Sequence, residues 1–168
     1  MTMRYVIALG SNLGDPEASV CRAMDAVESR LGSSHSRRSS LYRTEPVGGP
    51  EQPDYVNAVI VVEVDADPRD VLRTLHEIEA QEGRVRDVRW GPRTLDLDII
   101  IAGDTVSDDP DLSLPHPRAH ERAFVLVPWH EVEPDAVLGD HGPIKALVEC
   151  GFRDQDIEVI HPGEGTRS

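Results

Sequence analysis

The fold of this chain is decided by the stretch Leu95-Asp96-Leu97-Asp98-Ile99-Ile100-Ile101. The alternation predicts a β-strand, in which every second residue points to the same face. The apolar residues expected to face the core are Leu95, Leu97, Ile99 and Ile101. Asp96 and Asp98 fall on the opposite face, roughly 6.6 Å apart along the strand. Two carboxylates at this spacing suit Mg²⁺, which prefers carboxylate oxygens and completes its shell with water and substrate phosphates. For an isolated Asp-x-Asp, the alternative is an edge strand with a solvated acidic face.

An arginine-rich segment directly precedes this strand. Arg84, Arg86, Arg89 and Arg93 lie close together in a chain that has 31 acidic and 17 basic residues. A guanidinium group can bind two phosphate oxygens at once and stays charged. These arginines could therefore hold a polyphosphate, while the two aspartates bind its metal ion. Arginines placed at a helix end for its dipole and for solubility are the alternative, which explains Arg84 and Arg86 better than Arg93.

Composition limits the partners and the location of the protein. A net charge of −14 argues against nucleic acid and anionic membranes as partners. No apolar run approaches the roughly 20 residues of a membrane span, and the first residues do not resemble a signal peptide. We therefore expect a cytoplasmic protein with one domain over residues 1–161 and a flexible tail over 162–168. Cys21 and Cys150 are expected to be reduced thiols in the core.

The order of elements predicts the fold class. Strands are expected at 5–9, 39–44, 55–64 and 95–101, helices at 16–31 and 68–83, and a further helical region after residue 114. A glycine-bounded turn is expected at 10–14, and a proline-rich loop at 45–53. This order indicates an α+β fold of ferredoxin-like type, with an antiparallel sheet and helices packed on one face. The other face would be open for a site.

Several nucleotide-binding and metal-binding motifs are missing from the sequence. Neither a P-loop nor a Gly-x-Gly-x-x-Gly fingerprint occurs, so a P-loop NTPase is excluded at the level of motifs. His116 and His120 have zinc-ligand spacing, but Pro117 lies between them and no third ligand is obvious. A phosphate pocket formed with Arg122 is the better interpretation of His116.

Taken together, these segments resemble the 6-hydroxymethyl-7,8-dihydropterin pyrophosphokinase family of folate biosynthesis. The resemblance spans nearly the whole chain, and it lies at residues 9–14, 42–44, 52–58, 83–86, 89–98 and 115–124. The run Trp-Gly-Pro-Arg-Thr-Leu-Asp-Leu-Asp at 90–98 is its most specific part. The resemblance implies the ferredoxin-like fold with additional elements. It also implies transfer of the β,γ-pyrophosphoryl group of ATP to the hydroxymethyl group of the pterin, with release of AMP.

The resemblance also implies roles for individual residues. Asp96 and Asp98 would hold two Mg²⁺ ions and, with Arg84 and Arg93, form the catalytic set. The implied ATP-binding residues are Leu72, His76, Arg84, Arg86, Arg89, Trp90, Arg93, His116 and Arg122. The implied pterin-binding residues are Thr44, Glu45, Val47, Tyr55, Asn57, Trp90, Asp96 and Phe124, with the rings of Tyr55 and Phe124 on the two sides of the pterin. We expect a monomer whose partners are ATP and the pterin.

Two other functions use similar residues. A non-catalytic domain that binds a small molecule could have the same fold. A nucleotidyltransferase or nuclease could use Asp-x-Asp to hold two metals, although the net charge weighs against a polynucleotide substrate. The nucleotide product formed from Mg·ATP and the reduced pterin separates these functions. AMP indicates pyrophosphoryl transfer, ADP a simple kinase, and no product a binding domain.

Overall fold

The computed structural model of the chain describes residues 2–12, 15–45, 54–83, 95–152 and 155–160. Its elements follow one another as β1 (Met3–Ser11), α1 (Pro16–Leu31), β2 (His35–Arg38), β3 (Leu41–Thr44), β4 (Tyr55–Val64), α2 (Pro68–Gly83), β5 (Leu95–Ala102), β6 (Ser107–Asp109), β7 (Leu112–Leu114), η1 (Ala119–Glu121), α3 (Ala123–Val132), η2 (Gly139–His141), α4 (Ile144–Cys150) and β8 (Ile157–Ile160). No helix in this part of the chain is long and apolar enough to span a membrane.

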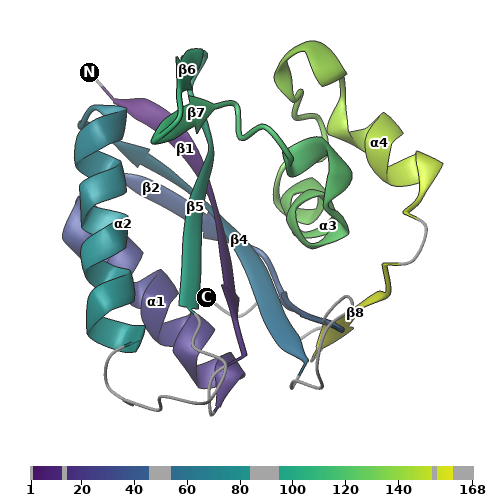
Figure 1. The fold of residues 1–168 in the computed structure, drawn as a ribbon, viewed down its shortest axis with the longest axis horizontal. Coiled ribbons are helices and arrows are strands. Elements are labelled where there is room, and N and C mark those ends of the chain that lie inside the picture. The colour runs from purple at the N-terminus through teal and green to yellow at the C-terminus, as the bar shows by residue number, and fades with distance from the viewer. Residues whose placement is uncertain (1, 13–14, 46–53, 84–94, 153–154, 161–168) are drawn as a thin grey trace.

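The strands form an antiparallel sheet with β1 and β4 at its centre. Its order is β5-β1-β4-β3-β8, and β2 extends beside β4. Every pairing within this sheet is antiparallel. A separate hairpin is formed by β6 and β7. Figure 1 shows the twisted sheet between two groups of helices. The predicted α+β class is confirmed.

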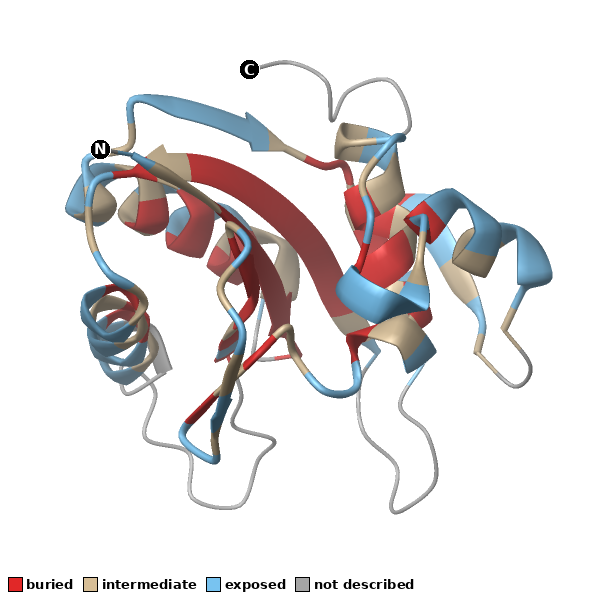
Figure 2. Cartoon of the chain, turned by 90° about the horizontal axis from the view of Figure 1, so that it is seen from above, coloured by how far each residue is buried: buried red, intermediate tan, exposed pale blue. Residues whose placement is uncertain are grey.

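The two faces of the sheet carry two hydrophobic cores. On one face, α1 and α2 pack over a core that includes Leu9, Ile60 and Leu97. On the other face, α3 packs against β4 and α4 packs against α3, around the fully buried Trp129. The expected position of helices on one face therefore holds for α1 and α2, while α3 and α4 are additional elements on the other face (Figure 1). Figure 2 shows the buried residues gathered on the central strands and on the helix sides that face them.

The first helix has the predicted ends. The side chain of Asp15 accepts a hydrogen bond from the backbone N–H of Ala18 at 3.2 Å, and Pro16 begins the helix. The helix stops at Gly32, whose φ of 62° is the left-handed conformation that glycine adopts without strain. These caps orient α1 so that Val20, Val27 and other apolar residues face the sheet.

The parity prediction for β5 is wrong at its end. Leu95, Leu97 and Ile99 face the core under α1 and α2 as expected, but Ile101 belongs to the core on the α3 side. The register with β1 shifts between the pairs Ile7–Ile99 and Val6–Ile101, so one residue of β5 has no partner. Such a β-bulge reverses the alternation of side chains beyond it.

Other local predictions also need correction. The strand expected at 39–44 begins only at Leu41, as β3, and the strand β2 precedes it on the other side of Ser39 and Ser40. Gly10 lies within β1 and not in a turn. Cys21 and Cys150 are free thiols, but both are exposed and not in the core. The tail at 162–168 lies outside the described residues.

Candidate active site

Three neighbouring strands place the predicted pterin and metal residues side by side. In the sheet register, Gly10 of β1 lies between Asn57 of β4 and Asp96 of β5. Directly paired residues of an antiparallel sheet point to the same face, which here is the face that α3 covers. Asp98 follows on this face, opposite Ala8. Because Gly10 has no side chain, the surface between Asn57 and Asp96 is left hollow.

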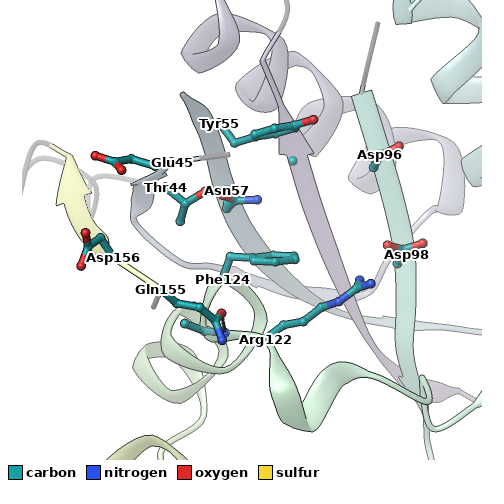
Figure 3. Close-up of a pocket in the computed structure, with 12 residues that line it drawn as sticks. Thr44, Glu45, Tyr55, Asn57, Asp96, Asp98, Arg122, Phe124, Gln155 and Asp156 are labelled. Carbon is teal, nitrogen blue, oxygen red and sulfur yellow. Dashed lines mark hydrogen bonds between the residues drawn. The ribbon is translucent and has the colours of Figure 1, made fainter. Parts of the chain in front are cut away.

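This hollow is the floor of a cavity of about 330 Å³, within the range of pockets that bind small molecules. Most of the predicted pterin residues line it, together with Asp98 and Arg122, as drawn in Figure 3. The full lining consists of Gly10, Thr44, Glu45, Tyr55, Asn57, Asp96, Asp98, Arg122, Ala123, Phe124, Gln155 and Asp156. Gly10, Ala123, Gln155 and Asp156 were not predicted from the sequence. Of these, Gly10 had a signal, because it lies in the segment 9–14, which resembles the family.

The rings of Tyr55 and Phe124 face the cavity from opposite sides, with the amide of Asn57 between them (Figure 3). Tyr55 comes from the start of β4, and Phe124 from the first turn of α3. A flat heterocycle between two rings gains contact area and favourable aromatic geometry. The structure therefore brings together the two aromatic residues that the sequence proposed as a pair.

Asn57 is buried, and a neighbour fixes the orientation of its amide. The hydroxyl of Thr44 donates a hydrogen bond to Asn57 Oδ1 at 2.7 Å. Since Oδ1 accepts this bond, the Nδ2 group turns toward Gly10. A Cβ atom on Gly10 would lie 2.7 Å from Nδ2, closer than real Cβ contacts allow. The glycine thus provides the space in which the amide presents its N–H donors to the cavity.

The start of α3 adds a positive charge to the cavity. The guanidinium of Arg122 lies 5.4 Å from the centroid of the Phe124 ring, a cation–π contact. In Figure 3 its side chain extends from α3 toward Asp98. Asp96, Asp98 and the Arg122 guanidinium therefore lie at one side of the cavity, while the aromatic and amide groups lie toward the other side, which also carries the carboxylates of Glu45 and Asp156.

His116 lies near Asp98, in the segment that follows β7. Its backbone N–H donates to the carbonyl of Ile100 at 2.8 Å, which ties it to β5. Its Nδ1 accepts a hydrogen bond from the N–H of Arg118 at 3.1 Å, so the neutral ring carries its proton on Nε2. Burial lowers the pKa of His116, and nearby Arg122 lowers it further, against the opposing effect of Asp98. The shift favours the neutral imidazole, whose Nε2–H group is a hydrogen-bond donor.

The helix α2 borders the other edge of β5. A carboxylate oxygen of Glu79 accepts a hydrogen bond from the N–H of Leu97 at 2.8 Å, on the residue between the two aspartates. Burial raises the pKa of Glu79, and this hydrogen bond opposes the rise. The predicted ATP residues Leu72 and His76 also lie on α2, but neither lines the cavity. Leu72 packs against the core under α1 and α2, and His76 is exposed.

Six of the predicted site residues lie outside the described residues, and they are Val47, Arg84, Arg86, Arg89, Trp90 and Arg93. Their roles stay predictions. The zinc alternative finds no support in the described ranges, where no group of three or more His, Cys, Asp or Glu side chains gathers as a metal site. His120 instead stacks on His141, with ring centroids 3.8 Å apart.

Among the described residues, no third side chain joins Asp96 and Asp98 to complete a metal site. Two carboxylates fit a cation that takes its remaining oxygens from phosphates and water, as Mg²⁺ does. Carboxylates, a guanidinium and paired rings in one cavity suit a site that brings a phosphate group beside a flat heterocycle, as a phosphotransferase requires.

Comparison with known proteins identifies the family. The model of the 7,8-dihydro-6-hydroxymethylpterin-pyrophosphokinase family matches residues 6–134, and the chain belongs to this family. The 2-amino-4-hydroxy-6-hydroxymethyldihydropteridine pyrophosphokinase of Pseudomonas aeruginosa is 43% identical over 154 residues, which cover 90% of this chain and 94% of the relative. The enzyme of the same name from Haemophilus influenzae is 42% identical over 157 residues, with 93% and 97% covered.

The fold also matches solved structures. The HPPK-DHPS protein of Plasmodium falciparum has a TM-score of 0.70 with 13% sequence identity. The match covers 89% of this chain but only 43% of that longer chain. At this identity the likeness concerns the fold alone, and it confirms the antiparallel α+β architecture.

Proposed function

We propose that the cavity binds 6-hydroxymethyl-7,8-dihydropterin beside Mg·ATP. There the chain carries out the reaction of its family, transferring pyrophosphate from ATP to the hydroxymethyl oxygen and releasing AMP, a step of folate biosynthesis. One observation carries this assignment. In the register of the sheet, Asn57 and Asp96 lie on the two sides of Gly10. An amide suited to the edge of a heterocycle therefore adjoins a carboxylate suited to the Mg²⁺ of Mg·ATP.

The pterin end of the proposed site uses stacking and directed hydrogen bonds. Tyr55 and Phe124 would enclose the bicyclic ring, and the amide of Asn57 would donate to an acceptor on its edge. Thr44 maintains the amide orientation and so favours an acceptor at that place. These contacts hold the pterin with its hydroxymethyl group toward the carboxylates, which is the positioning that phosphoryl transfer needs.

The phosphate end uses charge. We propose that Asp96 and Asp98 hold two Mg²⁺ ions. These ions would neutralise negative charge on the phosphates of ATP. Arg122 would bind phosphate oxygens through its guanidinium, and His116 would donate to them from Nε2. Both groups can donate hydrogen bonds, because the Nδ1 atom of His116 accepts from Arg118 and leaves the proton on Nε2, and because a guanidinium does not lose its proton.

The remaining ATP contacts and charge stabilisation are proposed for the arginine-rich segment. Arg84 and Arg93 would act on the transferring group, while Arg86, Arg89 and Trp90 would contact the nucleotide. Support for these roles comes from the sequence of the segment that directly precedes β5. The monomeric state and the cytoplasmic location stay predictions.

The test is product analysis with purified protein, ATP, MgCl₂ and 6-hydroxymethyl-7,8-dihydropterin. We expect AMP and the pterin diphosphate in equal amounts. The Asp98→Asn variant, which keeps the shape of the side chain but removes its charge, should form neither. ADP as the product would contradict pyrophosphoryl transfer. The absence of any nucleotide product from the native chain would favour a binding domain instead.

A further inference from the structure

The side chain of Gln155 bridges two backbone groups at the start of α3. Its Oε1 accepts a hydrogen bond from the N–H of Ala123 at 2.9 Å, and its Nε2 donates to the carbonyl of Glu121 at 3.0 Å. The amide can satisfy both groups in one orientation only. Gln155 therefore holds the backbone on each side of Arg122.

This bridge supplies a cap that the helix does not make for itself. Arg122 occupies the N-cap position of α3 and forms no side-chain cap hydrogen bond. The first N–H groups of a helix need acceptors from outside the helix, and Ala123 is buried. The acceptor comes from a residue 32 positions later in the chain, beyond residues 6–134 that match the family model.

The bridge also connects two parts of the cavity wall. Gln155 precedes β8, whose Ile157 pairs with Thr44 at the end of β3. Thr44 orients Asn57, whereas the start of α3 carries Phe124. Gln155 thus joins the strand that fixes the amide at the pterin edge to the helix that supplies the ring on the pterin face. All of these residues except Ile157 line the cavity (Figure 3).

We propose that Gln155 is a positioning residue for the pterin. By holding the 121–123 backbone, it sets the place of the Phe124 ring and of the Arg122 guanidinium in the cavity. This inference rests on the proposed function, because it assumes that Phe124 stacks on the pterin. Gln155 acts through the helix start and not through the chemistry, so the nature of the product does not depend on it.

The first experiment compares Gln155→Ala with Glu158→Ala. Glu158 is an exposed residue of β8 whose ion pair with Arg43 spans 3.6 Å, so its variant controls for changes in this strand. Titration with 6-hydroxymethyl-7,8-dihydropterin should show a dissociation constant about tenfold higher for Gln155→Ala, because the Phe124 ring must then be ordered when the pterin binds. Glu158→Ala should bind like the native chain. Equal affinities for all three proteins would overturn the proposal.

A double-mutant cycle separates positioning from general stability. In the Phe124→Ala background, Gln155→Ala should weaken pterin binding less than twofold, because the ring that it positions is gone. The same tenfold loss in both backgrounds would show a role that does not pass through Phe124, and would overturn the proposal. Failure of the proposed function looks different. In that case the native chain forms no AMP with the pterin, or Phe124→Ala alone leaves pterin affinity unchanged.

Discussion

Gly10→Ala should damage the pterin site while leaving the fold intact. The added Cβ would lie 2.7 Å from Asn57 Nδ2, whereas ordinary contacts begin at 3.4 Å. The amide must therefore move by about 0.7 Å or rotate. Either movement disturbs the 2.7 Å hydrogen bond from Thr44 and turns the N–H donors away from the cavity.

The size of the effect follows from these contacts. A net hydrogen bond contributes roughly 0.5–1.5 kcal/mol, and a buried partner left unsatisfied costs about 1–3 kcal/mol. The dissociation constant for the pterin should therefore rise about 10-fold to 100-fold. Disturbing the Thr44–Asn57 hydrogen bond should cost the fold about 0.5–1.5 kcal/mol. Ala is favoured over Gly in a strand by about 0.5–1 kcal/mol, which offsets much of this cost, so the fold should stay intact.

Calorimetric titration with the pterin and with a non-hydrolysable Mg·ATP analogue measures both ends of the site. We expect the loss for the pterin alone. The matched control is Asn57→Ala, in which the clashing amide is absent, and Gly10→Ala added to it should change pterin affinity less than twofold. Native pterin affinity in the single variant would refute the close-approach argument. Equal losses for both ligands would also refute it, since they would mean that the whole sheet end is distorted.

Three further predictions test other parts of the molecule. Asp98→Ala should abolish turnover and keep the native melting temperature, because the carboxylate serves the metal and not the fold; native-like turnover would remove that role. Phe124→Ala should weaken pterin binding about tenfold or more in calorimetry, while Tyr55→Phe should be mild, because stacking uses the ring face and not the hydroxyl. The hydrogen bond from Arg38 lowers the pKa of Glu28 below its ordinary 4.5, so this pair stabilises the fold above that pH and the effect is lost as the pH falls through the lowered pKa. Thermal melts between pH 3 and 6 should therefore show a shallower decline for Glu28→Gln than for the native chain, and identical slopes would contradict the linkage.

Local sequence patterns predicted most of the elements because they depend on neighbouring residues. The caps of α1 need only Asp15, Pro16 and Gly32, and all three act within one turn of the helix ends. Strand parity placed Asp96 and Asp98 together on one face for the same reason. The bulge in β5 had no such signal, since three consecutive isoleucines suit either parity.

Site residues that depend on distant parts of the chain were harder to predict. Gln155 reaches the start of α3 only because β8 pairs with β3, and a single glutamine near the chain end has no local pattern. Gly10 was interpreted as part of a turn because glycine is common there. Its actual role, as the gap between Asn57 and Asp96, depends on the register of three strands.

The antiparallel topology explains why one end of the sheet holds both halves of the site. Because β4 and β5 each run antiparallel to β1, both begin at the end of the sheet where β1 finishes at Ser11. Tyr55 opens β4 and Leu95 opens β5, so Asn57 and Asp96 are each within a few residues of a strand start. In the sequence, the segments directly before these two starts are the proline-rich 46–53 and the arginine-rich 84–94. The fold therefore places Asn57 of β4, proposed for the pterin, and Asp96 of β5, proposed for the metal, on either side of Gly10, on the face of the sheet against which α3 packs.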